Sequence, residues 1–215
     1  MNETKLKDFI ELNFVGRFKD NNQIFDLTSE ELAKKEKLYN PQAKYGPKII
    51  CLGENHILKA LDKFLVDKEI GKSYKLDLKP QEAFGKKDPK FIKIVNIDVL
   101  RKQNINPFPG LQINASGLMA TVRSVTGGRV TLDFNHPLAG KNITYEVTIN
   151  KIITENKEKL ISLVENLLEL GSKDYSLELQ DKKVKLKLKA TIHSQIKEQF
   201  KKKVKDLLSL DVEFS

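Results

Sequence analysis

Apolar and polar residues alternate along much of the first 80 residues of the chain, which is the pattern of strands with one buried face. Residues 9–18, FIELNFVGRF, alternate and are followed by the polar residues Asp-Asn-Asn at 20–22, a hairpin-turn signal. YNPQAKYGPKIICLG, residues 39–53, reads as a loop broken by Pro41 and Pro47 and then a strand. KEIGKSYKLDLKPQEAFG, residues 68–85, reads as a turn, an alternating strand and a loop. This part of the chain is therefore expected to form a sheet.

Two short helices are expected between these strands. In TSEELAKKEKL, residues 28–38, Thr28 or Ser29 is suited to cap the first turn. In residues 54–66 the apolar residues recur at helical spacing, namely at Ile57, Leu58, Leu61, Phe64 and Leu65.

The pattern changes at residues 86–136, where short strands separated by turns are predicted. Gly127-Gly128 is a strong signal for a tight hairpin. This segment holds eight basic and three acidic residues, so it carries about half of the net charge of +9. The alternating pattern of the first part returns at residues 141–153.

From residue 154 onward the chain reads as helix, two strands, helix and strand. The first helix is predicted to begin at Thr154 and to stop at Gly171, and the two strands meet around Asp181-Lys182. Each helix has one apolar face, so residues 154–215 are expected to form a separate small domain.

Composition excludes several classes of protein. A hydrophobic content of 40% supports a folded core, and a single cysteine, Cys51, excludes internal disulfides and cysteine metal clusters. No zinc, P-loop, nucleotide-binding or nucleophile-elbow motif is present, so no metal and no cofactor are expected. The start of the chain lacks a signal sequence and no run is long enough to span a membrane, so we expect a cytoplasmic protein without membrane contact.

The stretch DFNHPLAGK, residues 133–141, leaves three interpretations open. His136 is suited to catalysis or to ligand binding, whereas Pro137 ends a strand. By spacing alone, a turn between strands is favoured over an active-site loop.

Five segments in order resemble the FKBP-type peptidyl-prolyl cis-trans isomerases, specifically the SlyD-like and archaeal long-type members. The matching segments are NFVGRF, QIFD, LGENHILKALDKFL, IGKSYKLDLKPQEAFG and DFNHPLAGKNITYEV. The last of these stands where SlyD-like proteins re-enter the catalytic domain after an insertion in the flap.

The resemblance implies an α+β fold with three parts. These are an FKBP-like antiparallel half-barrel around a short helix (1–86 and 137–153), a β-rich insert-in-flap domain (87–136) and a C-terminal α/β domain (154–215). It implies isomerisation of Xaa-Pro bonds in unfolded or nascent polypeptides with exposed prolines, possible ribosome association, and client holding by the insert. A holdase or protein-binding module with a weak or inactive pocket is the alternative. Nucleic acid binding is not expected, because the lysines alternate with acids.

The resemblance also implies a prolyl site. Its residues are Phe14, Phe25, Asp26, Ile57, Leu58, Leu61, Phe84, His136, Leu138 and Tyr145. Phe25, Leu61 and Tyr145 would enclose the proline ring, Ile57 would donate its backbone N–H to the substrate, and Asp26 would lie near the rotating carbonyl. The site reading is favoured, but two alternatives stay open: Phe14, Phe25, Leu58 and Leu61 are also suited to a plain core, and Asp26 is also suited to capping the loop that bears the helix.

The site departs from the family pattern in three positions. Many members have Tyr where Phe14 and Phe84 stand, and the drug-binding members have Trp where Leu61 stands. These departures argue against binding of macrolide inhibitors more than against isomerase activity. The missing phenol at Phe84 is what keeps the holdase alternative open.

The insert holds more apolar residues than so short a segment easily buries. The expected client-binding residues are Ile92, Ile94, Val99, Leu100, Phe108, Leu118 and Met119. Part of the insert's apolar set is expected to form its own small core.

Overall fold

A computed structural model describes residues 2–115 and 117–214. The chain divides into two compact units, Met1–Asp77 with Thr144–Ser215, and Leu78–Ile143. The first unit contains a half-barrel sheet and a C-terminal helix-and-sheet layer, and the second contains the insert.

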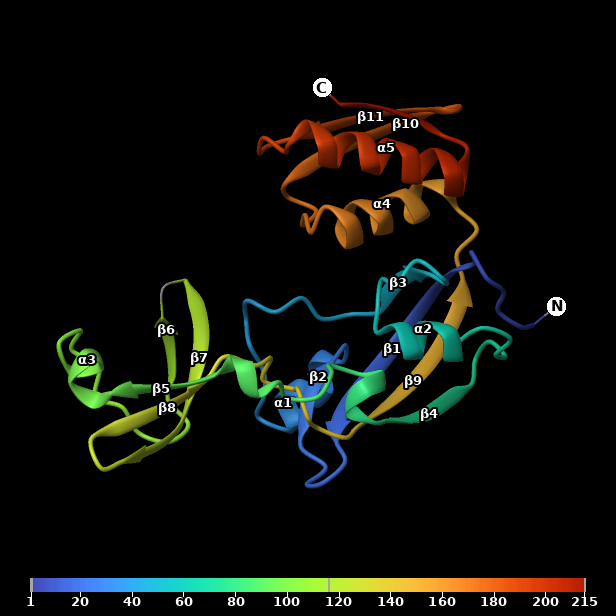
Figure 1. Ribbon diagram of the computed structural model, residues 1–215. Helices are drawn as coiled ribbons and strands as arrows, with labels where there is room; N and C mark the ends of the chain where they lie inside the picture. Colours follow the sequence, from blue (N-terminus) through green and yellow to red (C-terminus); the bar gives the residue numbers. More distant parts are fainter. Residues whose placement is uncertain (1, 116, 215) are drawn as a thin grey trace. The chain divides into compact units, whose positions relative to one another are not determined.

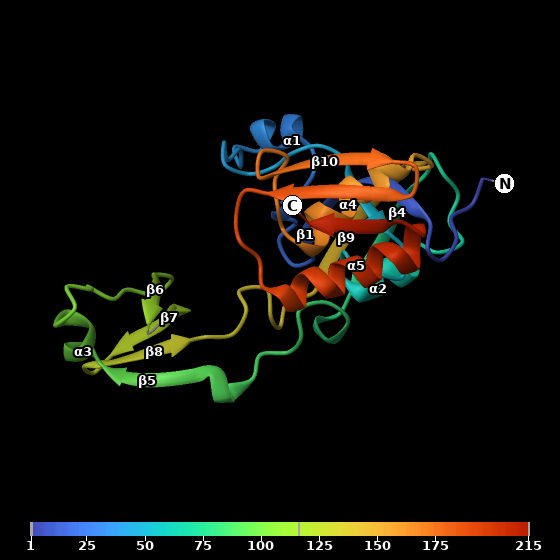
Figure 2. The ribbon, with the colours of Figure 1, turned by 90° about the horizontal axis from the view of Figure 1, so that it is seen from above.

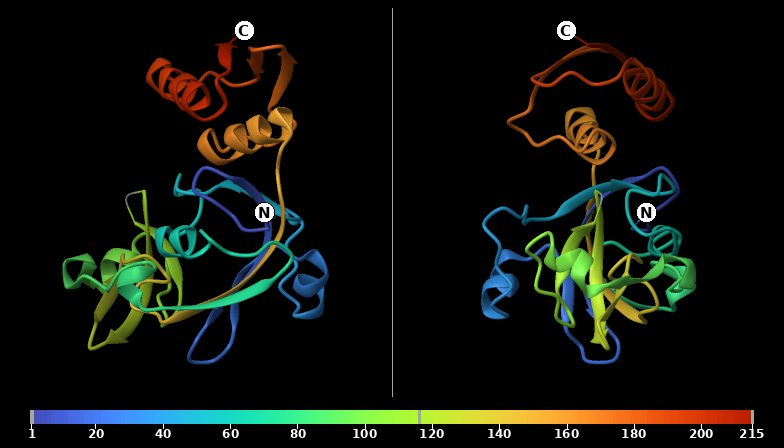
Figure 3. Two further views of the ribbon diagram at one scale, coloured as in Figure 1. Left: turned by 90° about the vertical axis from the view of Figure 1, so that its right-hand side faces the viewer. Right: turned by 60° about the vertical axis from the view of Figure 1, so that its left-hand side comes forward.

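The half-barrel sheet is built around one long strand, β1, as the alternation predicts. Its strands are β1 (Phe9–Phe18), β2 (Ile24–Leu27), β3 (Lys48–Cys51), β4 (Ser73–Leu78) and β9 (Ile143–Ile152). They lie in the order β2-β1-β9-β4, and β1 and β9 run side by side (Figures 1 and 3). Residues 9–12 of β1 pair with β3 and residues 15–17 pair with β2, so the sheet is split at Asn13 and Phe14.

Two short helices accompany this sheet. In α1 (Glu30–Lys35) the cap is Ser29, whose side chain accepts a hydrogen bond from the backbone of Leu32. In α2 (Lys59–Phe64), which lies beside the half-barrel sheet in Figure 1, the Leu61 side chain is buried. The buried Asp62 carboxylate accepts hydrogen bonds from the backbone N–H groups of Gly53 (3.0 Å) and Asn55 (3.0 Å). The loop before α2 is therefore held in place by α2 itself.

The C-terminal segment has the predicted order of helix, two strands, helix and strand. The elements are α4 (Asn156–Leu167), β10 (Tyr175–Gln180), β11 (Lys183–Leu188), α5 (Ser194–Leu208) and β12 (Asp211–Phe214). The sheet order is β10-β11-β12, with β11 and β12 parallel, and α5 packs on it (Figure 2). The predicted ends of α4 are wrong: Glu155 occupies the cap, and the helix ends at Leu167, several residues before Gly171.

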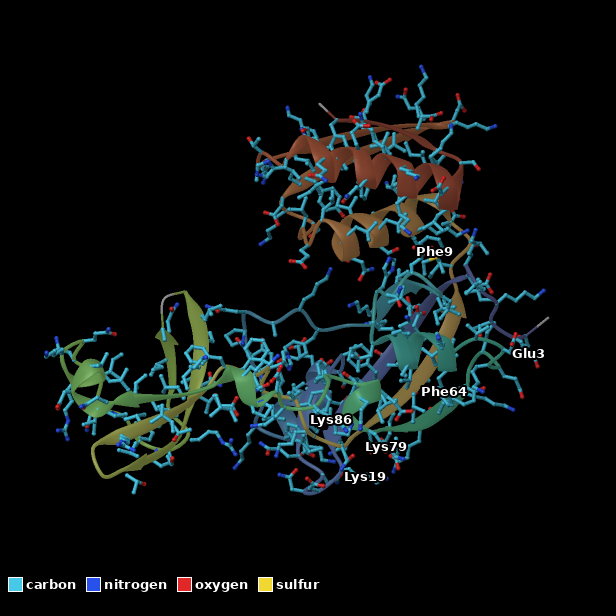
Figure 4. The ribbon with its side chains drawn as sticks, viewed as in Figure 1. Glu3, Phe9, Lys19, Phe64, Lys79 and Lys86 are labelled. Carbon is cyan, nitrogen blue, oxygen red and sulfur yellow. The ribbon has the colours of Figure 1, made fainter. Side chains whose placement is uncertain are left out.

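One hydrophobic core joins this C-terminal layer to the half-barrel. Phe9 of β1 and Cys51 of β3 belong to the same cluster as Leu163 of α4 and Phe200 of α5. Figure 4 shows Phe9 at the end of β1 nearest to α4. The Asn166 side chain also donates a hydrogen bond to the backbone oxygen of Ile49 (2.9 Å). The C-terminal layer thus shares its core with the half-barrel.

The insert is a four-stranded antiparallel sheet with one short helix. Its elements are η2 (Pro89–Phe91), β5 (Ile92–Asn96), α3 (Ile97–Arg101), β6 (Gln112–Ala115), β7 (Leu118–Thr126) and β8 (Arg129–Asp133). The second unit also contains η1 (Pro80–Glu82), which precedes the insert. The hairpin at Gly127-Gly128 is formed as predicted, with φ of 57° and 73°. The sequence pattern missed α3, because a single turn capped by Asn96 shows no periodicity.

None of the helices in residues 2–115 and 117–214 combines the length and the apolar character needed to cross a membrane.

Candidate active site

Three aromatic rings from three neighbouring strands meet in the half-barrel. The ring of Tyr145 on β9 makes edge-to-face contacts with Phe14 of β1 (centroids 5.8 Å apart) and Phe25 of β2 (5.7 Å). The Phe18 ring also contacts Phe25 (centroids 5.1 Å apart). Such contacts hold each ring in a defined orientation. The structure therefore brings together three of the residues expected to line the prolyl site.

Gly16 makes this aromatic cluster possible, and sequence reasoning gave it no role. A Cβ atom at Gly16 would lie 2.8 Å from Phe25 Cζ and 3.1 Å from Tyr145 Cε1. The β1–β2 pairing also shifts register between Gly16 and Arg17. A glycine inside an otherwise alternating strand is a known signal of a bulge or of a close approach, and it was available in NFVGRF.

Asp26 lies beside the cluster and is the acidic group of the site. Its carboxylate accepts a hydrogen bond from the Tyr145 hydroxyl (3.2 Å). Burial raises the pKa of Asp26, against the opposing effects of the Tyr145 hydrogen bond and the charge of Lys48. Burial together with the Asp26 carboxylate also raises the pKa of Tyr145, so the phenol stays protonated and remains a donor. Like Gly16, Lys48 lies beside the candidate site and was not indicated by the sequence analysis.

Ile57, Leu58 and Leu61 lie at the start of α2. Ile57 and Leu58 are half-buried, and Leu58 occupies the helix cap without a side-chain hydrogen bond. Leu61 is 1% exposed. Leu61 is therefore suited to the floor of a prolyl pocket, and Ile57 and Leu58 are partly accessible.

His56 precedes Ile57 and is a half-buried, neutral imidazole. Its Nδ1 accepts a hydrogen bond from the backbone N–H of Cys51 (3.1 Å), which places the ring proton on Nε2. Among the described residues no atom pairs with the buried Nε2. Burial lowers the pKa of His56, although the carboxylates of Glu54 and Asp62 act in the opposite direction.

We expect His56 to make stability fall as the pH falls below about 6.5. Because the pKa of His56 is lower in the folded chain, the unfolded chain binds more protons than the folded chain between the folded pKa and about 6.5. The contribution of His56 to stability is therefore fully present above about pH 6.5 and is lost as the pH falls. His56→Gln should flatten the dependence of the unfolding free energy on pH between about 7 and 5, where one group contributes at most about 1.4 kcal/mol per pH unit. Urea denaturation at a series of pH values measures this slope.

The matched control is His193→Gln, at an exposed histidine before α5, and it should keep the slope of the wild type. An unchanged slope in His56→Gln would show that His56 does not titrate differently in the folded and unfolded chains.

The remaining expected site residues belong to the second unit. The rings of Phe84 and His136 stack in parallel (centroids 4.8 Å, interplanar angle 2°), and His136 Nδ1 accepts a hydrogen bond from the backbone of Leu138 (3.2 Å). The Gly140 N–H donates to the backbone oxygen of Gly85 (2.8 Å). The segment that contains His136 is therefore a turn held by hydrogen bonds and by the stacked rings of Phe84 and His136.

A network of polar contacts joins the two chain segments at the base of the insert. Lys87 pairs with the buried Asp133 (2.6 Å), and Asn135 exchanges hydrogen bonds with the backbone of Asp88 (2.8 and 3.1 Å). Burial by itself would raise the pKa of Asp133, but the hydrogen bonds from Lys87 and Asn135 outweigh it, and the pKa is lowered. These contacts fix the base of the insert within its own unit.

Most of the apolar residues expected to face clients are exposed on the insert. Their exposed fractions are Ile94 66%, Val99 50%, Phe108 57%, Leu118 64% and Met119 59%. Ile92 is only half-buried, and Phe91, which was not among the expected residues, is 54% exposed. Leu100 is a correction: it is 4% exposed and belongs to the insert core with Val122, Val130 and Leu132, because α3 turns it inward.

Comparisons with known proteins match both units. A family model described as "FKBP-type peptidyl-prolyl cis-trans isomerase" covers residues 1–100, and one described as "FKBP26, IF domain" covers residues 93–138.

Relatives similar to this chain carry the same description. A "Short-type peptidyl-prolyl cis-trans isomerase" of Methanocaldococcus jannaschii is 26% identical over 152 residues, 71% of this chain and 96% of that protein. A "Probable FKBP-type 16 kDa peptidyl-prolyl cis-trans isomerase" of Pseudomonas fluorescens is 31% identical, over 48% of this chain and 71% of that protein. SlyD of Helicobacter pylori is 23% identical, over 54% of this chain and 64% of that protein.

The site, the insert and these matches agree. The chain belongs to the FKBP-type peptidyl-prolyl cis-trans isomerases, as a SlyD-like member with an insert domain, and is an enzyme of this class.

Proposed function

We propose that this isomerase acts on Xaa-Pro bonds of unfolded or nascent polypeptides and that its insert holds these clients near the prolyl site. The observation that carries the proposal is the cluster of Phe14, Phe25 and Tyr145 with Asp26 hydrogen-bonded to it. In this proposal residues 1–86 and 137–153 carry out catalysis and residues 87–136 hold the client. Residues 154–215 form a third domain.

The proposed reaction requires no nucleophile. Rotation about an Xaa-Pro amide crosses a barrier of roughly 18–20 kcal/mol, and it takes on the order of 10–100 s without a catalyst. No covalent bond breaks. The twisted amide loses resonance and charge separation, so an apolar pocket stabilises it relative to the planar amide. Each ~1.4 kcal/mol of this preference accelerates the reaction tenfold.

The proposed roles follow from chemistry and position. Phe25, Leu61 and Tyr145 would enclose the proline ring, and Ile57 would donate its backbone N–H to the substrate carbonyl. Asp26 would interact with the rotating amide, since its raised pKa reflects a partly desolvated carboxyl group. Phe14 would support the Tyr145 ring, and Leu58 would line the entrance. Phe84, His136 and Leu138 would form a rim for the residues beside the proline.

The exposed apolar residues of the insert support client holding. Five large apolar side chains, at Ile94, Val99, Phe108, Leu118 and Met119, are at least half exposed, and unfolded chains offer matching apolar segments. Binding a client there raises the effective concentration of its prolines at the prolyl site. The excess of basic residues would favour acidic and nascent chains, including chains still on the ribosome.

The first experiment is refolding of a proline-limited protein with three variants. Phe25→Ala should lower the catalysed rate of prolyl isomerisation by at least about tenfold, both in the refolding protein and in a proline tetrapeptide, because it opens the pocket. Replacing residues 88–135 by a short loop should lower it at least about tenfold for the protein, but less than about threefold for the tetrapeptide. Phe64→Ala is the control, because Phe64 is a half-buried ring of α2 that packs on Tyr74 (6.3 Å) and should leave both rates near wild type (Figure 4).

A wild-type protein that prevents aggregation of the client without accelerating its slow phase would favour the alternative, a holdase with an inactive pocket. Equal losses for protein and tetrapeptide in the loop variant would contradict the proposed role of the insert.

A further inference from the structure

A groove of about 460 Å³ lies between the half-barrel and α4, within the first unit. This volume is within the range of roughly 300–1,000 Å³ that is typical of ligand pockets. Its apolar lining includes Leu27, Pro47 and Ile49 from the half-barrel and Ile161 and Leu170 from the C-terminal segment. The groove is therefore an apolar surface built from two parts of the chain.

The split in the half-barrel sheet opens this groove. β3 pairs with residues 9–12 of β1 and β2 with residues 15–17, so β2 and β3 part from each other along β1 at Asn13 and Phe14. Hydrogen bonds nevertheless hold β1 and the end of β2 together at this point. The buried Thr28 accepts a hydrogen bond from Phe14 N–H at its Oγ1 (3.0 Å), and its own N–H donates to Phe14 O (3.0 Å).

The groove is continuous with the candidate active site through shared residues. Phe14 and Asp26 both line the groove, while Phe14 contacts the Tyr145 ring and Asp26 accepts the hydrogen bond from the Tyr145 hydroxyl. A polypeptide with its proline against Phe25 and Tyr145 can therefore continue past Asp26 into the groove without leaving the surface of the protein.

Contacts between the two walls keep the groove in shape. The Asn166 side chain bonds to the backbone of Ile49, and Lys44 pairs with Glu165 of α4 (2.6 Å). The core shared by Phe9, Cys51 and α4 lies behind these contacts. The Lys44 side chain is 72% exposed, so its ion pair is weak enough to be exchanged for a charge on a bound chain.

The charges at the groove suit a chain of mixed sequence. Lys44 and Lys48 line it on the half-barrel side, and Glu165 and Glu169 line it on the C-terminal side. An extended polypeptide can place apolar side chains on the lining and pair side chains of either sign at the rim.

We propose that this groove is a second substrate subsite, which binds the polypeptide segment next to the isomerised proline and gives the C-terminal segment a part in substrate binding. The proposal rests on the proposed function, since it needs the proline at Phe25 and Tyr145. It predicts that a longer substrate binds more tightly than a short one for a reason separate from the insert.

The test compares a proline tetrapeptide with a 12-residue peptide that has one central proline and leucines on both sides. Isomerisation of each is followed by NMR exchange in the full chain. Ile161→Arg places a charge on the groove lining and Glu169→Arg changes its exposed rim. Both should raise KM for the long peptide about fivefold or more, with kcat unchanged, and leave the tetrapeptide within about twofold. Ile196→Arg, at a 41% exposed isoleucine on α5 outside the groove, is the matched control.

A spin label gives a second measurement. Burial raises the pKa of Cys51, the single cysteine, to about 12, so a label at Glu169→Cys reacts selectively. It should broaden the resonances of the leucines beside the proline in the bound 12-residue peptide. The absence of broadening at saturating peptide would overturn the proposal.

The other outcomes are also distinct. An unchanged KM for the long peptide in both arginine variants would show that the groove is not used, while the isomerase assignment would stand. Equal losses for both peptides would place the effect in the prolyl pocket and would likewise refute a separate subsite. If the wild type turned over neither peptide, the proposed function itself would fail.

Discussion

Gly16→Ala should reduce isomerase activity by at least about tenfold, which corresponds to about 1.4 kcal/mol of lost transition-state stabilisation. The added methyl group would lie 2.8 Å from Phe25 Cζ and 3.1 Å from Tyr145 Cε1, so both rings must move. Overpacking of this kind costs about 1–3 kcal/mol of stability. Because the rings contact each other edge to face, a displacement of one changes the surface offered to proline. Turnover of a proline tetrapeptide measures the effect.

The control for this prediction is Arg17→Ala. Arg17 is the next residue of β1, and its side chain bonds to the backbone of Asn22 in the hairpin. It should keep activity within about twofold, as surface substitutions usually change stability by no more than about 0.5 kcal/mol. If Gly16→Ala retained full activity with an unchanged unfolding midpoint, the aromatic cluster would not be the proline-binding surface.

Leu163→Ala should lower the unfolding free energy by about 2–5 kcal/mol, the usual cost of removing a fully buried leucine. Leu163 of α4 is completely buried in the cluster that also contains Phe9 and Cys51 of the half-barrel. We therefore expect the C-terminal layer and the half-barrel to lose structure in one transition. Urea denaturation followed by circular dichroism, with isomerase activity measured at each urea concentration, tests both statements.

The matched control is Ile196→Ala, which removes the same apolar class of side chain from a position that is 41% exposed. Its midpoint should stay close to wild type. Activity that survives to the wild-type urea concentration in Leu163→Ala, while the circular dichroism signal falls earlier, would show that the two layers unfold independently.

Much of the secondary structure was predictable because it depends on neighbouring residues. Alternation along residues 9–18 and within residues 68–85 predicted β1 and β4, and the glycine pair at 127–128 predicted the hairpin between β7 and β8. The order of the C-terminal elements followed from the alternation in its strands and the helical spacing of apolar residues in its helices. The ends of α4 and the presence of α3 were missed, since capping and single turns depend on side-chain bonds that a periodicity does not contain.

The aromatic set was predictable only from the resemblance. The segments NFVGRF, QIFD and KNITYEV identified Phe14, Phe25, Asp26 and Tyr145 before any geometry was known. That these four are in contact follows from the sheet order β2-β1-β9, which brings residues about 120 positions apart within hydrogen-bonding distance. Whether a given apolar residue of the insert faced its core or the solvent was likewise open, as Leu100 shows.

Local pattern and family resemblance were thus sufficient for the α+β class, the order of elements, the insertion in the flap and the isomerase family. Packing between distant segments decided the rest: that Gly16 leaves room for two rings, that Phe9 and Cys51 share a core with α4, and that a groove opens beside Asp26. The physical reason is that alternation records which side of a strand is buried, but not which other element buries it. That choice depends on shape and volume across the whole fold, and these exist only once the chain has folded.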